Sequence, residues 1–221
     1  MAYAFPTFRE LRIWLVRMRP LALGLALLVL TSQVALASDN TGRTRVQYQV
    51  GIYNYYTRYV FESDFPTNIG GFNCRSRMSD GAAQWNAVGR ELRFASYASA
   101  NENWIDVKWD DLLWPFNDDL AFVANNPIFG DIGNSDLNVN ASPDKSGGGT
   151  WSWYCGTGDP SSAYIDLWSV AAHEFGHTVE LLHSGVGADT MYATIASGTI
   201  SKRSLTTHDK DGIKAMYAAA S

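Results

Sequence analysis

The sequence predicts an α+β domain, with a three-layer α/β arrangement as the alternative. Two patterns predict it: several short segments have the apolar periodicity of strands, and three longer segments have apolar residues at helical spacing. With 221 residues, of which 46% are hydrophobic and 18% charged, the chain has the composition of a folded globular protein. It contains no internal repeat and no second linker, so we predict one domain after the amino-terminal segment.

Five short segments predict strands, because they are rich in apolar, β-branched and aromatic residues. They are residues 46–52, 92–97, 105–109, 120–123 and 137–140. Apolar and polar residues alternate most clearly at Ile105, Val107 and Trp109, and the alternation in 46–52 is that of a half-buried strand. Residues 146–150 have the composition of a flexible loop.

Three segments predict helices, and they cover residues 79–89, 162–181 and 206–219. Either Ser79 or Asp80 can cap the start of the first helix, and Gly89 is suited to its end. Thr206 followed three residues later by Asp209 resembles a capping box, which predicts the start of the third helix.

Residues 1–37 have the layout of a secretory signal peptide. Arginines at positions 9, 12, 17 and 19 precede the apolar run 21–30, and Ala35-Leu36-Ala37 forms a small-x-small cleavage site before Ser38. An uncleaved membrane anchor is the alternative, but the run is shorter than the roughly 20 residues of a span. We therefore predict cleavage, a mature domain of residues 38–221, and a secreted, extracellular protein.

Charge excludes several classes of partner. Removing residues 1–37 takes away four arginines and one glutamate, which changes the formal net charge from −5 to −8. Nucleic acid requires a basic face, so we predict no nucleic-acid partner. No basic amphipathic stretch suited to anionic lipid is present, and we predict no stable membrane association after signal cleavage.

The chain has two cysteines, Cys74 and Cys155. In an oxidising compartment an isolated pair is expected to form one disulfide. The alternative is two thiolate metal ligands, but neither cysteine lies in the Cys-x-x-Cys spacing typical of such sites.

The run His-Glu-Phe-Gly-His at residues 173–177 predicts a zinc site. Residues four apart lie on one face of a helix, so His173 and His177 can bind one metal ion. Glu174 lies beside them and is suited to act as general base toward a water molecule. Catalytic zinc has three protein ligands and one open position, which requires one more donor.

We predict His183 as this third ligand. Glu180 continues the helical face, but at about 1.5 Å per residue it would lie roughly 10 Å along the axis from His173. The chain must therefore turn back after the helix and return His183 to the metal. Three of the four histidines fall within residues 173–183, and we interpret the fourth, His208, as a surface residue.

These residues resemble the active-site helix of the matrixins, which are metzincin metallopeptidases. The family pattern is His-Glu-x-x-His-x-x-Gly-x-x-His followed by a Met-containing turn, and Met191 lies eight residues beyond His183. In the family this methionine forms an apolar base under the metal and is not a ligand. Residues 205–217 resemble the family's carboxy-terminal helix, and the similarity is looser upstream of residue 165.

The resemblance implies a twisted mixed sheet with two helices above a zinc cleft and a loop-rich lower part with a carboxy-terminal helix. It implies a monomeric zinc endopeptidase of the extracellular matrix type, whose cofactor is one catalytic Zn²⁺ and whose substrate is polypeptide. The substrate would bind extended along an edge strand, for which we name Leu137 to Asn140.

Three features depart from the family pattern. Glu180 occupies the position of the family's glycine, at the turn where left-handed backbone angles are expected. The inhibitory cysteine motif is absent around Cys74, and the histidines left over do not suffice for a second, structural zinc. Ca²⁺ is a candidate for the Asp- and Gly-rich loops with Asp131, Asp136 and Asp144, although this composition usually reflects turns.

Two other functions compete with an active endopeptidase. The first is a catalytically impaired, secreted zinc-fold module that binds protein or glycan, which Glu180 and the high aromatic content favour. The intact Glu174 argues against it. The second is a zinc hydrolase acting on a non-peptide substrate, which the resemblance of Met191 to the turn of peptidases disfavours.

Overall fold

The structure is a computed structural model that describes residues 40–45, 47–98, 104–112, 117–128 and 130–220. The predicted signal peptide, residues 1–37, lies outside the described residues and stays a prediction. Within the described residues no helix is both long enough and apolar enough to cross a bilayer.

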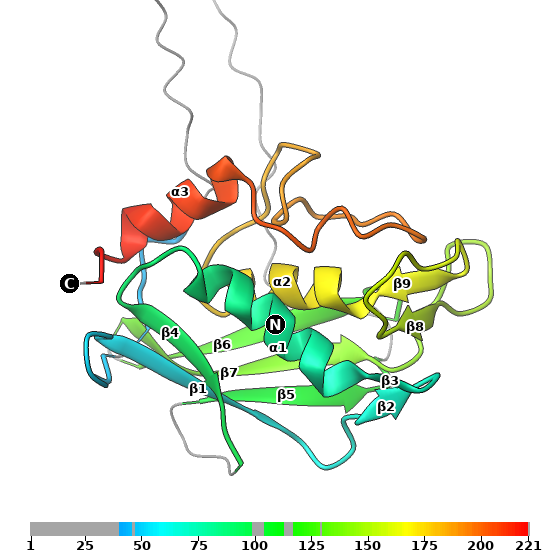
Figure 1. Cartoon of the computed structure of the whole chain (residues 1–221), viewed down its shortest axis with the longest axis horizontal. Helices are drawn as coiled ribbons and strands as arrows, with labels where there is room; N and C mark the ends of the chain where they lie inside the picture. The colour runs from blue at the N-terminus through cyan, green and yellow to red at the C-terminus, as the bar shows by residue number, and fades with distance from the viewer. Residues whose placement is uncertain (1–39, 46, 99–103, 113–116, 129, 221) are drawn as a thin grey trace, which may run out of the picture. The chain divides into compact units, whose positions relative to one another are not determined.

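A five-stranded mixed sheet forms one layer of the domain (Figure 1). Its strands are β1 (Tyr55–Phe61), β4 (Leu92–Ser96), β5 (Ile105–Asp110), β6 (Ala121–Ile128) and β7 (Asp131–Asn140). They lie in the order β4-β1-β5-β7-β6. Neighbouring strands are parallel except for β6, which pairs with β7 in antiparallel fashion and ends the sheet.

The predicted strands at 92–97 and 105–109 are confirmed as β4 and β5, and those at 120–123 and 137–140 are parts of the longer β6 and β7. The prediction for 46–52 is wrong. In the part of it that the structure describes, only isolated bridges form at Tyr48 and Val50. Tyr48 and Ile52 remain 53% and 52% exposed, since no layer covers them, and alternation alone could not reveal this.

The choice of Leu137 to Asn140 as the substrate-binding edge is also wrong. These residues lie in β7, which has β5 on one side and β6 on the other. Leu137 and Val139 are fully buried, and a strand with two partners has no free backbone groups to offer a peptide. The edge strand on this side of the sheet is β6.

Three helices accompany the sheet, namely α1 (Cys74–Asn86), α2 (Leu167–His177) and α3 (Thr207–Met216). The first begins five residues before the prediction, because the Asn73 side chain caps it by accepting a hydrogen bond from the Ser76 amide. The second is shorter than predicted, since residues 164–166 form a strand and the helix ends near Thr178. The capping box of the third, with Thr206 and Asp209, is confirmed.

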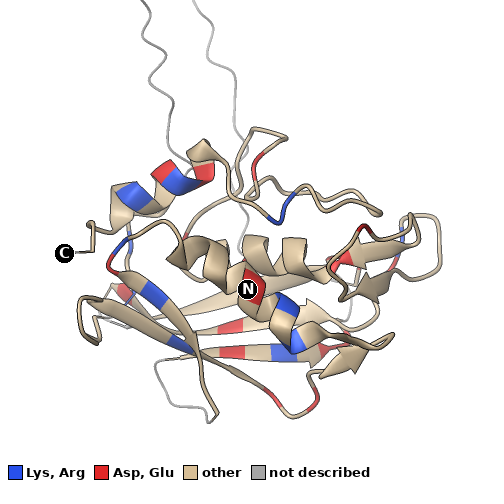
Figure 2. Ribbon diagram, in the orientation of Figure 1, with Lys and Arg blue, Asp and Glu red and all other residues tan. Residues whose placement is uncertain are grey.

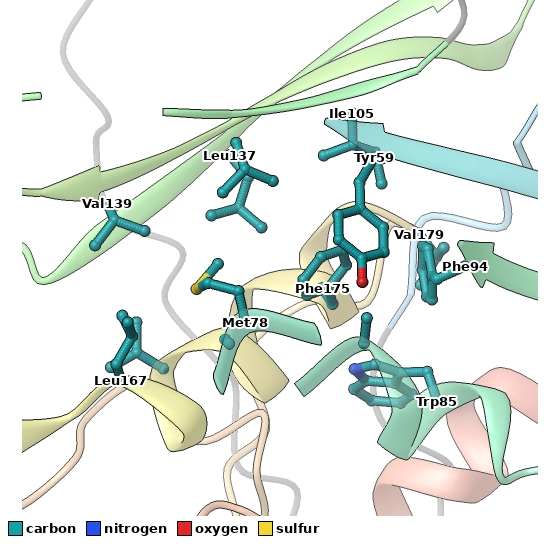
Figure 3. Packing of buried hydrophobic residues seen from close by; sticks show 14 of the residues in the cluster. Tyr59, Met78, Trp85, Phe94, Ile105, Leu137, Val139, Leu167, Phe175 and Val179 are labelled. Carbon is teal, nitrogen blue, oxygen red and sulfur yellow. The ribbon is translucent and has the colours of Figure 1, made fainter. Parts of the chain in front are cut away.

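The hydrophobic core lies between the sheet and the helices α1 and α2 (Figure 3). Tyr59, Ile105 and Leu137 of the sheet face Met78 and Trp85 of α1, and aromatic rings stack edge to face within this layer. The two helices approach so closely that a Cβ on Gly81 would lie 2.6 Å from the Cβ of Ala171. Glycine is required there because any side chain would push α2 away.

Two small sheets flank this layer, β2 (Asn68–Ile69) with β3 (Phe72–Asn73), and β8 (Ser152–Tyr154) with β9 (Tyr164–Asp166). A disulfide joins Cys74, at the start of α1, to Cys155, directly after β8. It connects parts of the chain 81 residues apart and leaves no free cysteine among the described residues.

Basic and acidic residues are interspersed on the ribbon in Figure 2, and α3 carries both signs within a few residues. The five-stranded mixed sheet with three helices makes this an α+β fold, as predicted.

Candidate metal centre

The helix α2 begins at a buried ion pair. Asp166 caps it by accepting hydrogen bonds from the amide and hydroxyl of Ser169, at 2.9 and 2.7 Å. Arg203 donates to both oxygens of the same carboxylate, at 2.6 and 2.9 Å, and also reaches three backbone carbonyls around residue 157. This fastens the start of α2 to the loop before α3. Sequence analysis missed Arg203, because a lone arginine in a loop carries no signal of a partner 37 residues away.

His173 and His177 lie on one face of α2, as their spacing predicts. Their Nε2 atoms are 3.0 Å apart. The Nδ1 of His173 lies 2.7 Å from the carbonyl of Thr190, and the Nδ1 of His177 lies 2.7 Å from the carbonyl of Leu181. A carbonyl only accepts hydrogen bonds, so each Nδ1 carries the proton and each Nε2 is left with a lone pair.

His183 completes the cluster from outside the helix. Its ring centroid lies 5.2 Å from that of His173 and 4.8 Å from that of His177, and one nitrogen from each ring falls within 4.8 Å of the others. The structure thus brings together all three histidines named from the sequence. In the part of the chain that the structure describes, these histidines are the one group of three or more His, Cys, Asp or Glu side chains that could hold a metal ion.

The turn expected before His183 occurs at Glu180. Its φ is +65°, and among the described residues it is the one non-glycine residue with a positive φ. A side chain in this left-handed region costs about 1–2 kcal/mol relative to glycine. The backbone here therefore has the conformation that the family's glycine would favour, although the residue is a glutamate.

The donor set fits a zinc ion. Two lone pairs that face each other at 3.0 Å repel unless a cation or a proton lies between them. A proton is disfavoured, since burial and the neighbouring His177 lower the pKa of His173 to about 3, and burial lowers the pKa of His177 to about 4. Three neutral imidazoles converging on one point are a common zinc ligand set in proteins.

Glu174 lies beside this cluster and is buried. Its Oε2 has no hydrogen-bond partner among the described residues. Burial, and then the negative charge of Asp119, raise the pKa of Glu174 to about 8. An unpaired carboxyl oxygen in this position is free to exchange a proton with a molecule in the adjacent cavity.

Met191 lies in a turn packed against Gly176 of α2. It is fully buried, and a Cβ on Gly176 would lie 2.3 Å from its sulfur, so the glycine in the 173–177 run makes room for it. Asp209 of α3 accepts hydrogen bonds from the amides of Thr190 and Met191, at 2.9 and 3.1 Å. The same Thr190 carbonyl holds His173, so α3 supports a metal-ligand candidate through one intermediate residue.

His208, which we interpret as a surface residue, is partly exposed and has a specific partner. Its Nδ1 lies 2.5 Å from the Oδ2 of Asp189. The same aspartate accepts hydrogen bonds from Ser184 and Thr206. Burial opposes ionisation of Asp189, but these hydrogen bonds outweigh it and hold the pKa of the carboxyl below its usual range.

A cavity of about 730 Å³ opens over the histidines. Leu120, directly before β6, and residues 121–123 and Asn125 of β6 form one wall. His173, Glu174 and His177 form the floor, and Thr190, residues 192–195 and Lys202 complete the lining. The edge strand of the sheet therefore borders the candidate metal site directly.

The three aspartates named for calcium have separate partners. Asp131 accepts from the Thr44 hydroxyl, Asp136 pairs with Lys108, and Asp144 accepts from Asn117. Among the described residues they do not form a cluster of three metal-ligating side chains. Calcium stays a candidate that the turn-like composition of these loops disfavours.

Comparison with known proteins gives a family match and two partial relatives. The family model described as Matrixin matches residues 59–218. Metalloendoproteinase 2-MMP of Arabidopsis thaliana is 47% identical over 58 residues, which cover 26% of this chain and 15% of that protein. Neutrophil collagenase of Homo sapiens is 44% identical over 61 residues, which cover 28% of this chain and 13% of that protein. The alignments thus span a small part of either relative.

Proposed function

The chain belongs to the matrixin family, and on that premise we propose that it is a secreted zinc-dependent endopeptidase with Glu174 as its general base. One observation carries the proposal. The Nε2 lone pairs of His173 and His177 face each other, and the ring of His183 joins them, on the floor of a cavity beside the unpaired oxygen of Glu174. The names of both relatives, a metalloendoproteinase and a collagenase, support a polypeptide substrate.

His173, His177 and His183 would hold the zinc ion. When bound, the ion supplies a Lewis acid that polarises a carbonyl and makes water more acidic. The Nδ1 hydrogen bonds to the carbonyls of Thr190 and Leu181 fix the tautomer of two of the ligands and orient their rings.

Glu174 would move the proton. Its Oε2 accepts a proton from the attacking water and then delivers it to the amine that leaves the cleaved peptide bond. In the metal-free protein, burial raises the pKa of Glu174 to about 8, which favours the protonated carboxyl that donates to the leaving amine. A cation held by the histidines would favour the carboxylate that accepts the proton from water. In the overall reaction, one water is consumed, the peptide C–N bond is broken, and one carboxyl and one amine are formed.

The substrate would bind extended along β6. This strand ends the sheet, runs along the cavity wall and offers its outer edge for strand addition. Pro127, which lacks an amide hydrogen, lies at a register shift in the same strand, and pairing with β7 continues beyond it.

The test is hydrolysis of a denatured protein such as casein by the purified protein, with and without a zinc chelator. We expect cleavage that stops with the chelator and returns with added zinc. Full zinc occupancy without cleavage of casein or of a peptide library would instead favour the zinc-fold binding module. Secretion is tested separately, by looking for a mature chain that begins at Ser38 in the medium.

A further inference from the structure

The ring of His183 is held differently from those of the other two histidines. His173 and His177 each have an Nδ1 hydrogen bond to a backbone carbonyl. The ring of His183 contacts the rings of His173 and His177 but makes no hydrogen bond with any described residue. The residue is also exposed. Its position therefore depends on the backbone that leads to it, which is the turn at Glu180.

The carboxylate of Glu180 is held on both oxygens. Asn125 of β6 donates from Nδ2 to Oε1 at 2.9 Å, and the same Nδ2 donates to the carbonyl of His177 at 2.8 Å. Thr41 donates from its hydroxyl to Oε2 at 2.6 Å, and from its amide to the Glu180 carbonyl at 3.2 Å. Asn40 adds an isolated bridge to Leu181.

Asn125 is itself fixed by a buried network. Its Oδ1 accepts a hydrogen bond from Ser135 on β7 at 2.5 Å. Arg45, which is 2% exposed, donates from Nη1 to the Ser135 hydroxyl at 2.8 Å and to the carbonyl of Thr178 at 3.0 Å. The network thus connects two strands, the segment 40–45 and the end of α2.

We propose that Glu180 is a positioning residue for His183. Its side-chain hydrogen bonds stabilise the left-handed turn, which a glycine would adopt through its conformational freedom. The stabilised turn fixes the position of His183, whose ring has no hydrogen bond of its own to the described residues. The role rests on the proposed zinc site. It also ties the third ligand to β6, the strand proposed to bind substrate, through the single side chain of Asn125.

The experiment measures the zinc dissociation constant of the full chain and its variants by competition with a chromophoric chelator. Glu180→Ala removes the hydrogen bonds and keeps a side chain in the left-handed region. Glu180→Gly removes the hydrogen bonds but relieves the backbone. Glu180→Gln keeps both the size and most hydrogen bonds, because the Thr41 hydroxyl can accept as well as donate.

We expect zinc affinity to fall by about 10–100-fold in Glu180→Ala, as is typical of residues that orient metal ligands. Glu180→Gly should also bind zinc at least about 10-fold more weakly than the parent, and Glu180→Gln should stay within a few-fold. Asn125→Ala should resemble Glu180→Ala, whereas Thr41→Val should have a smaller effect because that hydrogen bond is exposed.

Asn73→Ala provides the matched control. It removes the hydrogen-bonded cap of α1 and so lowers stability at a position outside the metal cluster. A purely structural role for Glu180 would make its variants behave like this control, with a lower melting temperature of the zinc-free protein and unchanged zinc affinity.

Two results would overturn the proposal. One is a Glu180→Gly variant that binds zinc as tightly as the parent or more tightly, which would show that the glutamate is only tolerated. The other is Glu180→Ala with unchanged zinc affinity. Both would leave the proposed function intact, whereas a parent protein that binds no zinc would remove the proposed function as well.

Discussion

At the scale of single residues, the buried carboxyl of Glu174 allows the proton transfer to be tested independently of zinc binding. It lines the cavity beside the histidines and is not one of the candidate metal ligands, and its Oε2 has no hydrogen-bond partner among the described residues. Loss of this group should therefore affect turnover and leave the zinc in place.

We predict that Glu174→Gln lowers kcat by at least about 100-fold, the usual contribution of a general base. The amide keeps the shape of the side chain but cannot accept the proton from water. Zinc content and melting temperature, measured on the same preparation, should match the parent. A variant that cleaves casein at the parental rate would show that another group is the base.

The histidines differ from Glu174 in what their loss removes. His177→Ala deletes one of two ligands on the helix, so we expect the protein to lose stoichiometric zinc after dialysis and, with it, all chelator-sensitive cleavage. His208→Ala is the matched control, because it removes an imidazole outside the cluster. Retention of one zinc per chain by His177→Ala would refute the ligand assignment.

At the scale of elements, the contact between α1 and α2 sets the position of the metal-binding helix. Gly81 faces Ala171 and the amide of Ala172, and the indole of Trp85 donates to the Ala172 carbonyl at 2.8 Å. Ala171 and Ala172 lie two and one residues before His173. A shift in the contact between the two helices therefore displaces the metal site.

We predict that Gly81→Ala destabilises the protein by about 1–3 kcal/mol, because the added methyl group overpacks this contact. Denaturant unfolding measures the change. Gly158→Ala is the control, since a Cβ there meets its nearest atom at an ordinary 3.6 Å and needs no positive φ. Equal denaturant midpoints for Gly81→Ala and Gly158→Ala would mean that the two helices move apart without loss of folding free energy.

The junction between the Met191 turn and α3 should be sensitive to acid. Because hydrogen bonds hold the pKa of Asp189 below its usual range, ionised Asp189 stabilises the folded state above the unfolded pKa of about 4. That stabilisation is lost as the pH falls through the lower folded value. The free energy of unfolding of Asp189→Asn should therefore be lower than that of the parent at pH 6, and the difference between the two free energies should shrink below pH 4. A difference independent of pH would contradict this.

At the scale of the whole described domain, the disulfide connects two segments that are far apart in the sequence. Cys74 starts α1 and Cys155 follows β8, with 81 residues between them. Closing a loop of this length stabilises the folded state mainly by restricting the unfolded chain.

We predict that replacing both cysteines by serine lowers the free energy of unfolding by about 2–5 kcal/mol. Thermal or denaturant unfolding with and without reductant measures it, because reductant should destabilise the parent by a similar amount and leave the double variant unchanged. Insensitivity of the parent to reductant would mean that the cysteines do not form the bridge in solution.

The fold class, the start of the third helix and the histidine group followed from the sequence, because each depends on residues close together along the chain. A spacing of four places His173 and His177 on one helical face, and the capping box of Thr206 and Asp209 is local too. The position of Glu180 was also informative, since the turn there is a local conformation.

The tertiary structure decided what depends on distant residues. It made β6 the edge strand beside the site, gave His208 its partner in Asp189, and left Tyr48 and Ile52 uncovered. It also placed Asn125 and Thr41 against Glu180, 55 and 139 residues away along the chain. Local periodicity carries no information on such pairs, because their approach depends on how the layers pack rather than on the conformation of any one segment.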